Sequence, residues 1–344
     1  MTDLRVGIYD SPVFRQHDAG AGHPERPERL DAIRLGLLDA DLEGRLESIS
    51  PRDATREELM RVHTAAHVDA VAATAGRTVR FDADTQAGPR SYASALLAAG
   101  AACDAVDKVL GGDLHRAFCV VRPPGHHAEA DRAMGFCLFN NVAVAAAHAL
   151  ARGLERVLII DFDVHHGNGT QHIFDRDRRV LYVSSHAWPF YPGTGALQEA
   201  GEGAARGFTV NLPMPMGCGD AEYAHLYREV VVPIGRAFDP ELVLVSAGFD
   251  AYKDDPLAGM RLTSAGYGEL AAACLETAKG AAGGRAVFVV EGGYDTDGLA
   301  TGAAAVTERL LGQSKPALTA PSAPSFAALV ASQRRFLATW WPIG

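Results

Sequence analysis

Two short histidine motifs carry most of the chemically reactive side chains of this sequence. The first is Arg122-Pro-Pro-Gly-His-His127, and the second is Asp161-Phe-Asp-Val-His-His-Gly-Asn-Gly-Thr170. Because side chains alternate between the two faces of a β-strand, a strand that continues into the second motif places three polar residues on one face: Asp161, Asp163 and His165. Such residues can bind a divalent metal ion and exchange protons.

A third carboxylate follows another strand-like segment. The run Leu242-Val-Leu-Val-Ser-Ala-Gly-Phe-Asp250 is apolar throughout, as in strands buried on both faces, and it ends in an aspartate. Asp163, His165 and Asp250 together form a set of two carboxylates and one imidazole. Three protein ligands leave a coordination position open for water or substrate. The pattern therefore predicts a catalytic metal centre.

The elements that would position these residues alternate along the chain. Strand-like runs are expected at about residues 6–9, 117–121, 157–161, 180–184, 209–212, 242–246 and 286–290, and Ala-rich helices at 92–110, 140–151, 220–237 and 264–279. This alternation predicts an α/β fold with a parallel sheet covered by helices on both faces. The polar motifs follow the strands, so they should converge beyond the carboxyl ends of the sheet.

Composition limits the class of protein. The chain has 344 residues, of which 48% are hydrophobic and 22% charged, which is typical of a globular protein. It begins without the pattern of a signal peptide and has no apolar run of membrane-spanning length. Its five cysteines form no Cys-x-x-Cys pair, so neither a disulfide framework nor a thiolate zinc site is expected. We expect a cytoplasmic protein with no membrane partner.

Charge gives a second limit. The formal net charge is -10 and no cluster of Lys and Arg offsets it, which argues against nucleic acid as a direct partner. An acidic surface would favour a cationic substrate such as a polyamine or a lysine-rich peptide. The same charge is also explained by solubility alone.

The C-terminal region differs in composition from the rest. No linker is evident before residue 312, so residues 1–311 are expected to form one catalytic domain. Residues 312–324 form a Pro/Ser-rich connector. A helix is expected from Phe326, with an apolar stripe that packs on the same domain or forms a homodimer contact: Phe326, Leu329, Phe336, Leu337, Trp340 and Trp341. The sequence leaves the oligomeric state open.

Taken in order, several motifs resemble the histone deacetylase superfamily, which includes bacterial class II-like deacetylases and acetylpolyamine amidohydrolases. They are Gly22-His-Pro-Glu-Arg-Pro-Glu-Arg29, Arg122-Pro-Pro-Gly-His-His127, Gly135-Phe-Cys137, Asn140-Asn141, Asp161 to Gln171, Tyr191-Pro-Gly-Thr-Gly195, Ser246-Ala-Gly-Phe-Asp250 and Glu291-Gly-Gly-Tyr294. The resemblance implies a single arginase/deacetylase-type α/β domain with a central parallel sheet of about eight strands. It also implies zinc-dependent hydrolysis of an N-acetyl group.

The resemblance assigns roles that fit the chemistry of the side chains. Asp163, His165 and Asp250 would bind Zn²⁺, which polarises the substrate carbonyl and activates water. His126 and His127 would transfer protons, as the partners of Asp161 and Asn168 respectively. Tyr294 would donate a hydrogen bond to the carbonyl oxygen as negative charge develops on it.

Further residues bear on the substrate, and again the resemblance assigns them. The substrate channel would be formed at Gly135, Phe136 and Tyr191. Either Asp82 or Asp84 would be a rim carboxylate, with gapless spacing favouring Asp82, although a solvated surface aspartate explains either residue equally well. A structural K⁺ ion is implied near Asp161 and Ser184.

Other interpretations remain open. Asn168 stands where class I deacetylases carry a second aspartate, which favours class II-like or polyamine-type relatives. An arginase-like ureohydrolase would share the fold but needs ligands for a second metal. A non-catalytic protein that binds acyl ligands is a further alternative, which the intact set with Tyr294 argues against. His63-Thr-Ala-Ala-His67 has the spacing of a helical zinc pair but lacks the glutamate of a zinc protease, so we interpret it as structural.

Overall fold

Eight parallel strands form one central sheet in the computed structural model, which describes residues 4–315 and 320–343. The spatial order is β2-β1-β5-β10-β9-β6-β7-β8. The strands are β1 (Val6–Tyr9), β2 (Glu47–Ile49), β5 (Arg116–Cys119), β6 (Val157–Asp161), β7 (Val180–Ala187), β8 (Thr209–Met214), β9 (Leu242–Ala247) and β10 (Ala286–Val290). A separate antiparallel pair is formed by β3 (Val79–Arg80) and β4 (Gln86–Ala87). The predicted α/β class with about eight parallel strands is confirmed.

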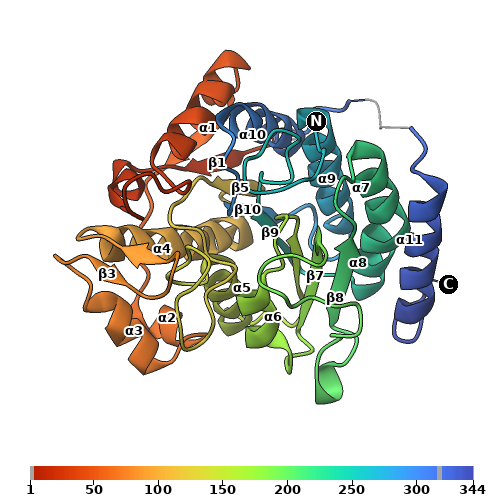
Figure 1. Cartoon of the computed structure of the whole chain (residues 1–344), viewed down its shortest axis with the longest axis horizontal. Helices are drawn as coiled ribbons and strands as arrows, with labels where there is room; N and C mark the ends of the chain where they lie inside the picture. Colours follow the sequence, from red (N-terminus) through yellow and green to blue (C-terminus); the bar gives the residue numbers. More distant parts are fainter. Residues whose placement is uncertain (1–3, 316–319, 344) are drawn as a thin grey trace.

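Helices cover both faces of this sheet (Figure 1). One layer contains α4 (Ser91–Gly111), α5 (Asn141–Ala151) and α6 (Asn168–Phe174), and the other contains α1 (Glu28–Asp39), α9 (Ser264–Thr277) and α10 (Thr296–Leu310). Other helices lie toward the edges: α2 (Arg56–Met60), α3 (Ala65–Ala72), α7 (Asp220–Leu226), α8 (Val232–Phe238) and α11 (Pro324–Leu337). Short turns of helix are η1 (Pro12–Gln16), η2 (Glu43–Arg45), η3 (Gly203–Ala205) and η4 (Tyr227–Val231).

The order of the strands explains where the polar motifs meet. β9 and β10 are the last two strands of the chain, yet they lie between β5 and β6 in the sheet. All residues of β6, β9 and β10 are buried, as expected for strands covered on both faces. Because the four neighbouring strands β5, β10, β9 and β6 run in parallel, the loops at their carboxyl ends converge at one edge.

Some helices and strands differ from those expected from the sequence, and these differences have physical explanations. β2 is a three-residue edge strand whose side chains are mostly exposed, so it lacks an apolar run. The helix expected at 220–237 is divided into α7, a π-helical turn η4 and α8. Pro233 is the second residue of α8, and because proline has no N–H it cannot make the regular helical hydrogen bond.

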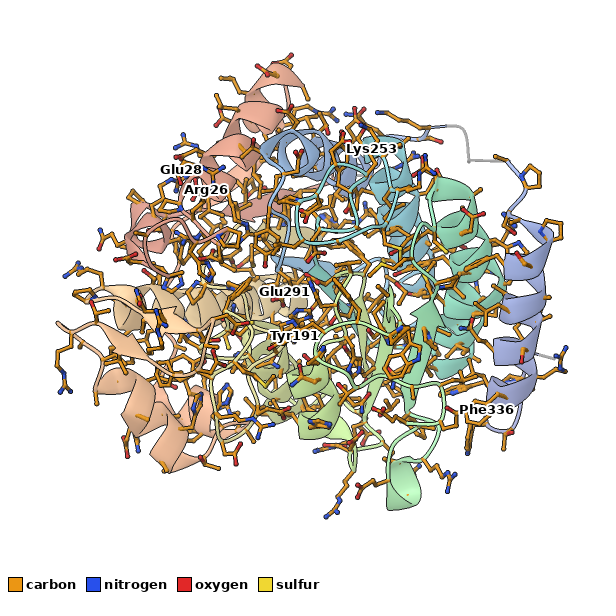
Figure 2. All side chains as sticks on the ribbon, in the orientation of Figure 1. Arg26, Glu28, Tyr191, Lys253, Glu291 and Phe336 are labelled. Atoms are coloured by element: carbon orange, nitrogen blue, oxygen red, sulfur yellow. The ribbon has the colours of Figure 1, made fainter. Side chains whose placement is uncertain are left out.

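The C-terminal helix α11 packs against α7 and η4. Phe326, Leu337 and Trp341 are buried, and the Trp341 indole donates to the Gly207 carbonyl at 2.8 Å. Phe336 is partly buried and lies at the edge of the molecule (Figure 2). Residues 316–319 of the predicted connector lie outside the described residues. Within the part of the chain that is described, no helix is long and apolar enough to cross a membrane.

Candidate active site

The loops after β5, β6, β9 and β10 surround one narrow cavity of about 80 Å³. Its lining brings together residues far apart in sequence: Asp84, Pro124, His126, His127, Gly135, Phe136, Asp163, His165, Tyr191, Leu257, Gly292 and Tyr294. Tyr191, labelled in Figure 2, is 37% exposed and lies at the mouth. Most residues that the sequence predicts for catalysis or substrate binding thus share one cavity.

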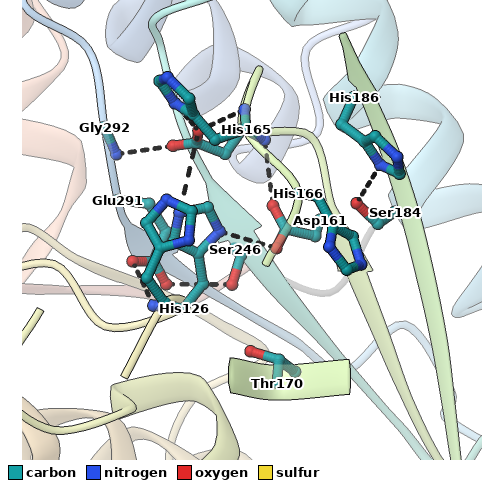
Figure 3. Close-up of polar contacts among 12 residues, drawn as sticks. His126, Asp161, His165, His166, Thr170, Ser184, His186, Ser246, Glu291 and Gly292 are labelled. Atoms are coloured by element: carbon teal, nitrogen blue, oxygen red, sulfur yellow. Dashed lines mark hydrogen bonds and ion pairs between the residues drawn. The ribbon is translucent and has the colours of Figure 1, made fainter. Parts of the chain in front are cut away.

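The three predicted metal ligands converge on one point. The ligand atoms of Asp163, His165 and Asp250 all lie within 4.8 Å of one another. His165 Nδ1 is 3.1 Å from Asp163 Oδ1 and 3.0 Å from Asp250 Oδ2. Backbone N–H groups fix the carboxylates, since Gly292 donates to Asp163 Oδ2 at 2.8 Å (Figure 3) and Val164 donates to Asp250 Oδ1 at 2.9 Å.

The electrostatics of this group suit a bound cation. Asp163 and Asp250 are completely buried, and burial together with the charge of Asp163 raises the pKa of Asp250 to about 7. Burial alone would lower the pKa of His165, but its hydrogen bonds to Asp163 and Asp250 raise it to about 10. In both residues the pKa is raised, and a proton is retained beside the buried negative charge of Asp163. The donor set of two carboxylates and one imidazole fits a divalent zinc ion.

His126 has a charged partner. Its Nδ1 lies 3.0 Å from Asp161 Oδ2, which also accepts a hydrogen bond from the Tyr182 hydroxyl at 3.0 Å. Burial disfavours the imidazolium form of His126, but the negative charges of Asp161 and Asp163 prevail and raise its pKa to about 10. Figure 3 shows His126 between Asp161 and Glu291.

His127 has a neutral partner instead. Its Nδ1 lies 2.7 Å from Asn168 Oδ1. Burial, with the neighbouring charges of His126 and His165, lowers its pKa well below the usual value. The pKa values of the two adjacent histidines are therefore shifted in opposite directions, upward for His126 and downward for His127. Their order of pKa values is the one expected from a carboxylate partner and an amide partner.

Tyr294 completes one wall of the cavity. It is 8% exposed, and among the described residues its hydroxyl has no hydrogen-bond partner. Burial raises the pKa of this hydroxyl well above its usual value, so it remains protonated. The Asp255 carboxylate accepts from the backbone N–H of Tyr294 at 2.7 Å and so fixes the residue. The hydroxyl is free to donate to a bound ligand.

Aromatic rings form the rest of the wall. The Phe136 ring meets Tyr294 edge-on at 5.9 Å, and the Tyr191 ring meets His127 edge-on at 5.1 Å. Gly135 is required next to Phe136 because its φ is +56° and a Cβ there would overlap the His127 ring. These rings leave a narrow apolar passage toward the histidines.

The two candidate rim carboxylates occupy different places. Asp84 lines the cavity, whereas Asp82 does not. Asp82 Oδ1 accepts from the backbone N–H groups of Asp84 at 3.0 Å and of Thr85 at 2.6 Å, so it stabilises its own turn. Gapless spacing favours Asp82, but the geometry of this turn favours Asp84 as the carboxylate at the mouth.

Sequence reasoning assigned no role to Glu291, which lies under the histidine pair. It is fully buried, and its carboxylate accepts from Ser246 Oγ at 3.0 Å and from the backbone N–H groups of Gly125 and His126 at 2.6 and 3.1 Å (Figure 3). Burial raises its pKa to about 7. Its position at the end of β10, in the motif with Tyr294, was the available signal.

A buried arginine is a second residue without an assigned role. Arg29 donates to the carbonyls of Glu291 and Gly293 at 2.5 and 2.6 Å, and its guanidinium lies 5.0 Å from the centre of the Tyr294 ring. Glu25 binds it at 3.0 Å. Glu25 and Arg29 of the Gly22–Arg29 motif thus support the loop that carries Tyr294.

Other histidines and acidic residues have different environments. His166 bonds Thr194 and Gln171, and His186 bonds Ser184 and Gly195, so neither lines the cavity. A second group with metal-binding residue types contains Glu58, Cys103 and His148. Arg52 pairs with Glu58 at 2.7 Å and Arg61 donates to His148 at 2.8 Å. Protein cations already occupy that group.

The fold and the cavity together define an α/β domain with acid–base groups beside a candidate metal site, and comparisons give its family. Residues 23–310 match the family described as Histone deacetylase domain, and the chain belongs to this family. The crystal structure of the HDA15 HD domain superposes with a TM-score of 0.93 at 40% identity, covering 99% of this chain and 96% of that one.

Two curated relatives indicate the range of the family. Histone deacetylase 15 of Arabidopsis thaliana is 44% identical over 87% of this chain and 55% of its own length. Polyamine deacetylase HDAC10 of Homo sapiens is 41% identical over 92% of this chain and 49% of its own length. The chain therefore spans about half the length of these relatives.

Proposed function

We propose that this protein is a zinc-dependent deacetylase that hydrolyses N-acetyl groups of acetyl-lysine side chains or acetylated polyamines. The observation that carries the proposal is the shared cavity, where Asp163, His165 and Asp250 lie beside two histidines of unlike protonation and an unpaired tyrosine hydroxyl. Relatives named as a histone deacetylase and a polyamine deacetylase support this class of reaction.

Asp163, His165 and Asp250 would hold the zinc ion. When bound, zinc supplies a Lewis acid that polarises the amide carbonyl and makes water a stronger acid. Backbone N–H groups hold the outer oxygens of both carboxylates, so their other oxygens remain directed at His165. The hydrogen bonds of these ligands are therefore part of the site's preorganisation.

The histidines divide the proton transfers. His127 is neutral, so its Nε2 can accept a proton from water as the general base. His126 is charged and paired with Asp161, so it stabilises negative charge and keeps a proton available for the leaving amine. Tyr294 donates its hydroxyl hydrogen to the carbonyl oxygen as that oxygen becomes negative.

The narrow cavity selects an acyl group on a slender chain. Phe136 and Tyr191 would contact the methylene groups of a lysine or polyamine, and Gly135 keeps the passage clear beside His127. Asp84 at the mouth would accept a hydrogen bond from the substrate backbone or an amine, with Asp82 stabilising the turn that presents it.

The proposal extends to properties beyond the cavity. A structural K⁺ ion would bind near Asp161 and Ser184, which are neighbours in register on β6 and β7. Residues 1–311 would form the catalytic domain, with 312–344 packed on it, in a cytoplasmic protein. α11 is the element we expect at any homodimer contact.

The proposal is tested by metal analysis and a substrate panel on the same preparation. We expect turnover of acetyl-lysine peptides or acetylated polyamines, loss of that turnover on chelation, and recovery on addition of Zn²⁺. Activity that survives complete chelation would exclude the mechanism. Turnover of guanidine substrates alone would favour an arginase-like ureohydrolase, and acyl-ligand binding without turnover would indicate a non-catalytic family member.

The rim assignment has a matched pair of variants. Asp84→Asn should raise KM for cationic substrates with little change in kcat, because only the contact at the mouth is lost. Asp82→Asn keeps an oxygen that can accept from the turn, so KM should stay near the wild-type value. The opposite result would assign the rim contact to Asp82.

A further inference from the structure

His127 depends on a partner whose chemistry is ambiguous. A side-chain amide has both an accepting oxygen and a donating NH₂ group, so an asparagine alone can bind either tautomer of a histidine. A carboxylate, such as Asp161 beside His126, only accepts. For His127 to act as a base at Nε2, its hydrogen must be on Nδ1, and Asn168 must therefore present its oxygen.

A buried carboxylate lies on the other side of Asn168. Glu129 Oε1 accepts from Asn168 Nδ2 at 2.6 Å, and the Glu129 side chain is 7% exposed. His172 Nδ1 lies 2.8 and 3.0 Å from the two carboxylate oxygens, and Arg132 lies 3.7 Å away. Two basic groups thus balance the charge of Glu129, and a continuous chain of hydrogen bonds runs from His127 to the partly exposed His172.

This chain determines the orientation of the amide. Because an ionised carboxylate has no hydrogen to donate, the NH₂ group of Asn168 must face Glu129. The Asn168 oxygen must then face His127, and the hydrogen of that imidazole is fixed on Nδ1. Asn168 Nδ2 also lies 3.3 Å from the His127 carbonyl, which reinforces the same orientation with a weaker contact.

We propose that Glu129 is a positioning residue for His127: acting through the Asn168 amide, it fixes the Nδ1–H tautomer of His127 and places a buried negative charge behind that imidazole. The expected effect of Glu129 on the rate rests on the proposed function, in which His127 is the base. The expected effect of Glu129 on the tautomer of His127 does not depend on that function.

The test uses a cycle of two substitutions. In Glu129→Gln the paired amides can turn together, so Asn168 can present either group to His127, and the charge is lost. We expect kcat to fall about 10- to 100-fold with KM little changed, as is typical for groups that orient a catalytic residue. In the Asn168→Asp background a carboxylate holds His127 directly and lies against Glu129. There Glu129→Gln removes a like-charge contact, so it should raise kcat.

Reversal of the sign distinguishes positioning from a structural role. A carboxylate needed only for folding would lower the melting temperature in both backgrounds, with no gain of kcat in the second. Glu199→Gln is a matched control, since Glu199 is a partly buried carboxylate that binds Gln171 at 2.9 Å and does not contact Asn168. It should leave kcat unchanged.

The tautomer is measured independently of turnover. In ¹⁵N-histidine-labelled protein, the His127 signal, assigned with His127→Gln, should show an Nδ1–H imidazole in the wild type and a mixture of tautomers in Glu129→Gln. A pure Nδ1–H tautomer in that variant, or equal losses of kcat in both backgrounds, would overturn the role of Glu129. If wild-type protein lacked deacetylase activity, the proposed function would fail while the tautomer result would still decide this inference.

Discussion

The His126–His127 pair and the His63–His67 pair are both buried, but they have different partners, and the first pair lines the cavity beside the predicted metal ligands. The His126 and His127 rings are 4.0 Å apart, and the His63 and His67 rings are 4.9 Å apart. His63 Nδ1 lies 2.9 Å from the Glu129 carbonyl, its Nε2 accepts from the Asn140 N–H at 2.9 Å, and His67 Nε2 lies 2.9 Å from the Leu138 carbonyl. Backbone groups thus occupy three of the four ring nitrogens of the second pair.

The catalytic pair is bonded differently. Side chains hold the Nδ1 atoms of His126 and His127, and both rings line the cavity with the metal-ligand residues. Residue type and burial are therefore the same in the two pairs. What separates the reactive histidines from the structural ones here is a side-chain partner that shifts the pKa of the ring and a place in the cavity beside the predicted metal ligands.

The largest expected effect comes from removing the centre that the catalytic pair faces. In Asp250→Ala, His165 loses one of its two carboxylate neighbours, so bound zinc and turnover should be lost together while most of the fold remains. Metal analysis of the wild type should give about one zinc per chain and not two. The group at Glu58, Cys103 and His148 already pairs with Arg52 and Arg61. Metal-free Asp250→Ala protein with wild-type turnover would contradict the assignment.

The same substitution made in each pair separates their roles. His127→Leu should lower kcat by about 10²- to 10⁴-fold, the usual contribution of a general base, and it also leaves the buried Asn168 oxygen without its partner. His67→Leu should leave kcat near the wild-type value. It leaves the Leu138 carbonyl without its partner, which typically costs about 1–3 kcal/mol in the free energy of unfolding.

Urea unfolding and kcat, measured on His127→Leu and His67→Leu, test whether catalysis depends on the first pair and not on the second. His67→Gln supplies a new N–H donor and should recover part of the stability. A large loss of kcat in soluble, folded His67→Leu would show that the second pair is coupled to catalysis.

Tyr294→Phe tests the role of the Tyr294 hydroxyl. Tyr294 lines the same cavity as His126 and His127. Removing one donor to a developing oxyanion typically lowers turnover about 10²- to 10³-fold, because the bond strengthens in the transition state. Zinc content should not change, and KM should change little. Full activity of Tyr294→Phe, with wild-type metal content and melting temperature, would exclude the assigned role.

Much of the site was predictable because its ligands are adjacent to strand ends. Asp163, His165 and Asp250 follow apolar runs that form β6 and β9, and parallel strands carry such residues to one edge. The structural role of His63 and His67 also agrees with their hydrogen bonds. The position of a residue at the end of a strand depends on its neighbours in the chain, so it can be predicted from the sequence.

Residues whose roles depend on long-range contacts were not predictable in this way. Glu129 follows His127 closely in sequence, but its contact with Asn168 appears only when the two loops meet. Asp255 binds the Tyr294 backbone across a similar separation. The choice between Asp82 and Asp84 depends on the hydrogen bonds of one turn. No spacing rule encodes these contacts.

The smallest predicted effect concerns the pH dependence of stability due to His63. Burial and the charge of His67 lower the pKa of His63 to about 3 in the folded protein, whereas an unfolded histidine titrates near 6.5. Between these values the unfolded chain binds a proton that the folded protein does not. The neutral His63 therefore contributes stability above pH 6.5, and this contribution is lost as the pH falls toward 3, at up to about 1.4 kcal/mol per pH unit.

The variant His63→Gln tests this pH dependence, because glutamine cannot titrate. It should be less stable than the wild type at pH 7.5, because a bridge between Glu129 and Asn140 is altered, but its stability should fall less steeply on acidification. Urea unfolding at pH 7.5, 6.5 and 5.5 measures both curves, and the buried histidines that do not contact His63 contribute equally to each. If the curves remain parallel, His63 titrates normally in the folded protein, and the backbone groups around it do not hold its ring neutral, as the contrast with His126 and His127 requires.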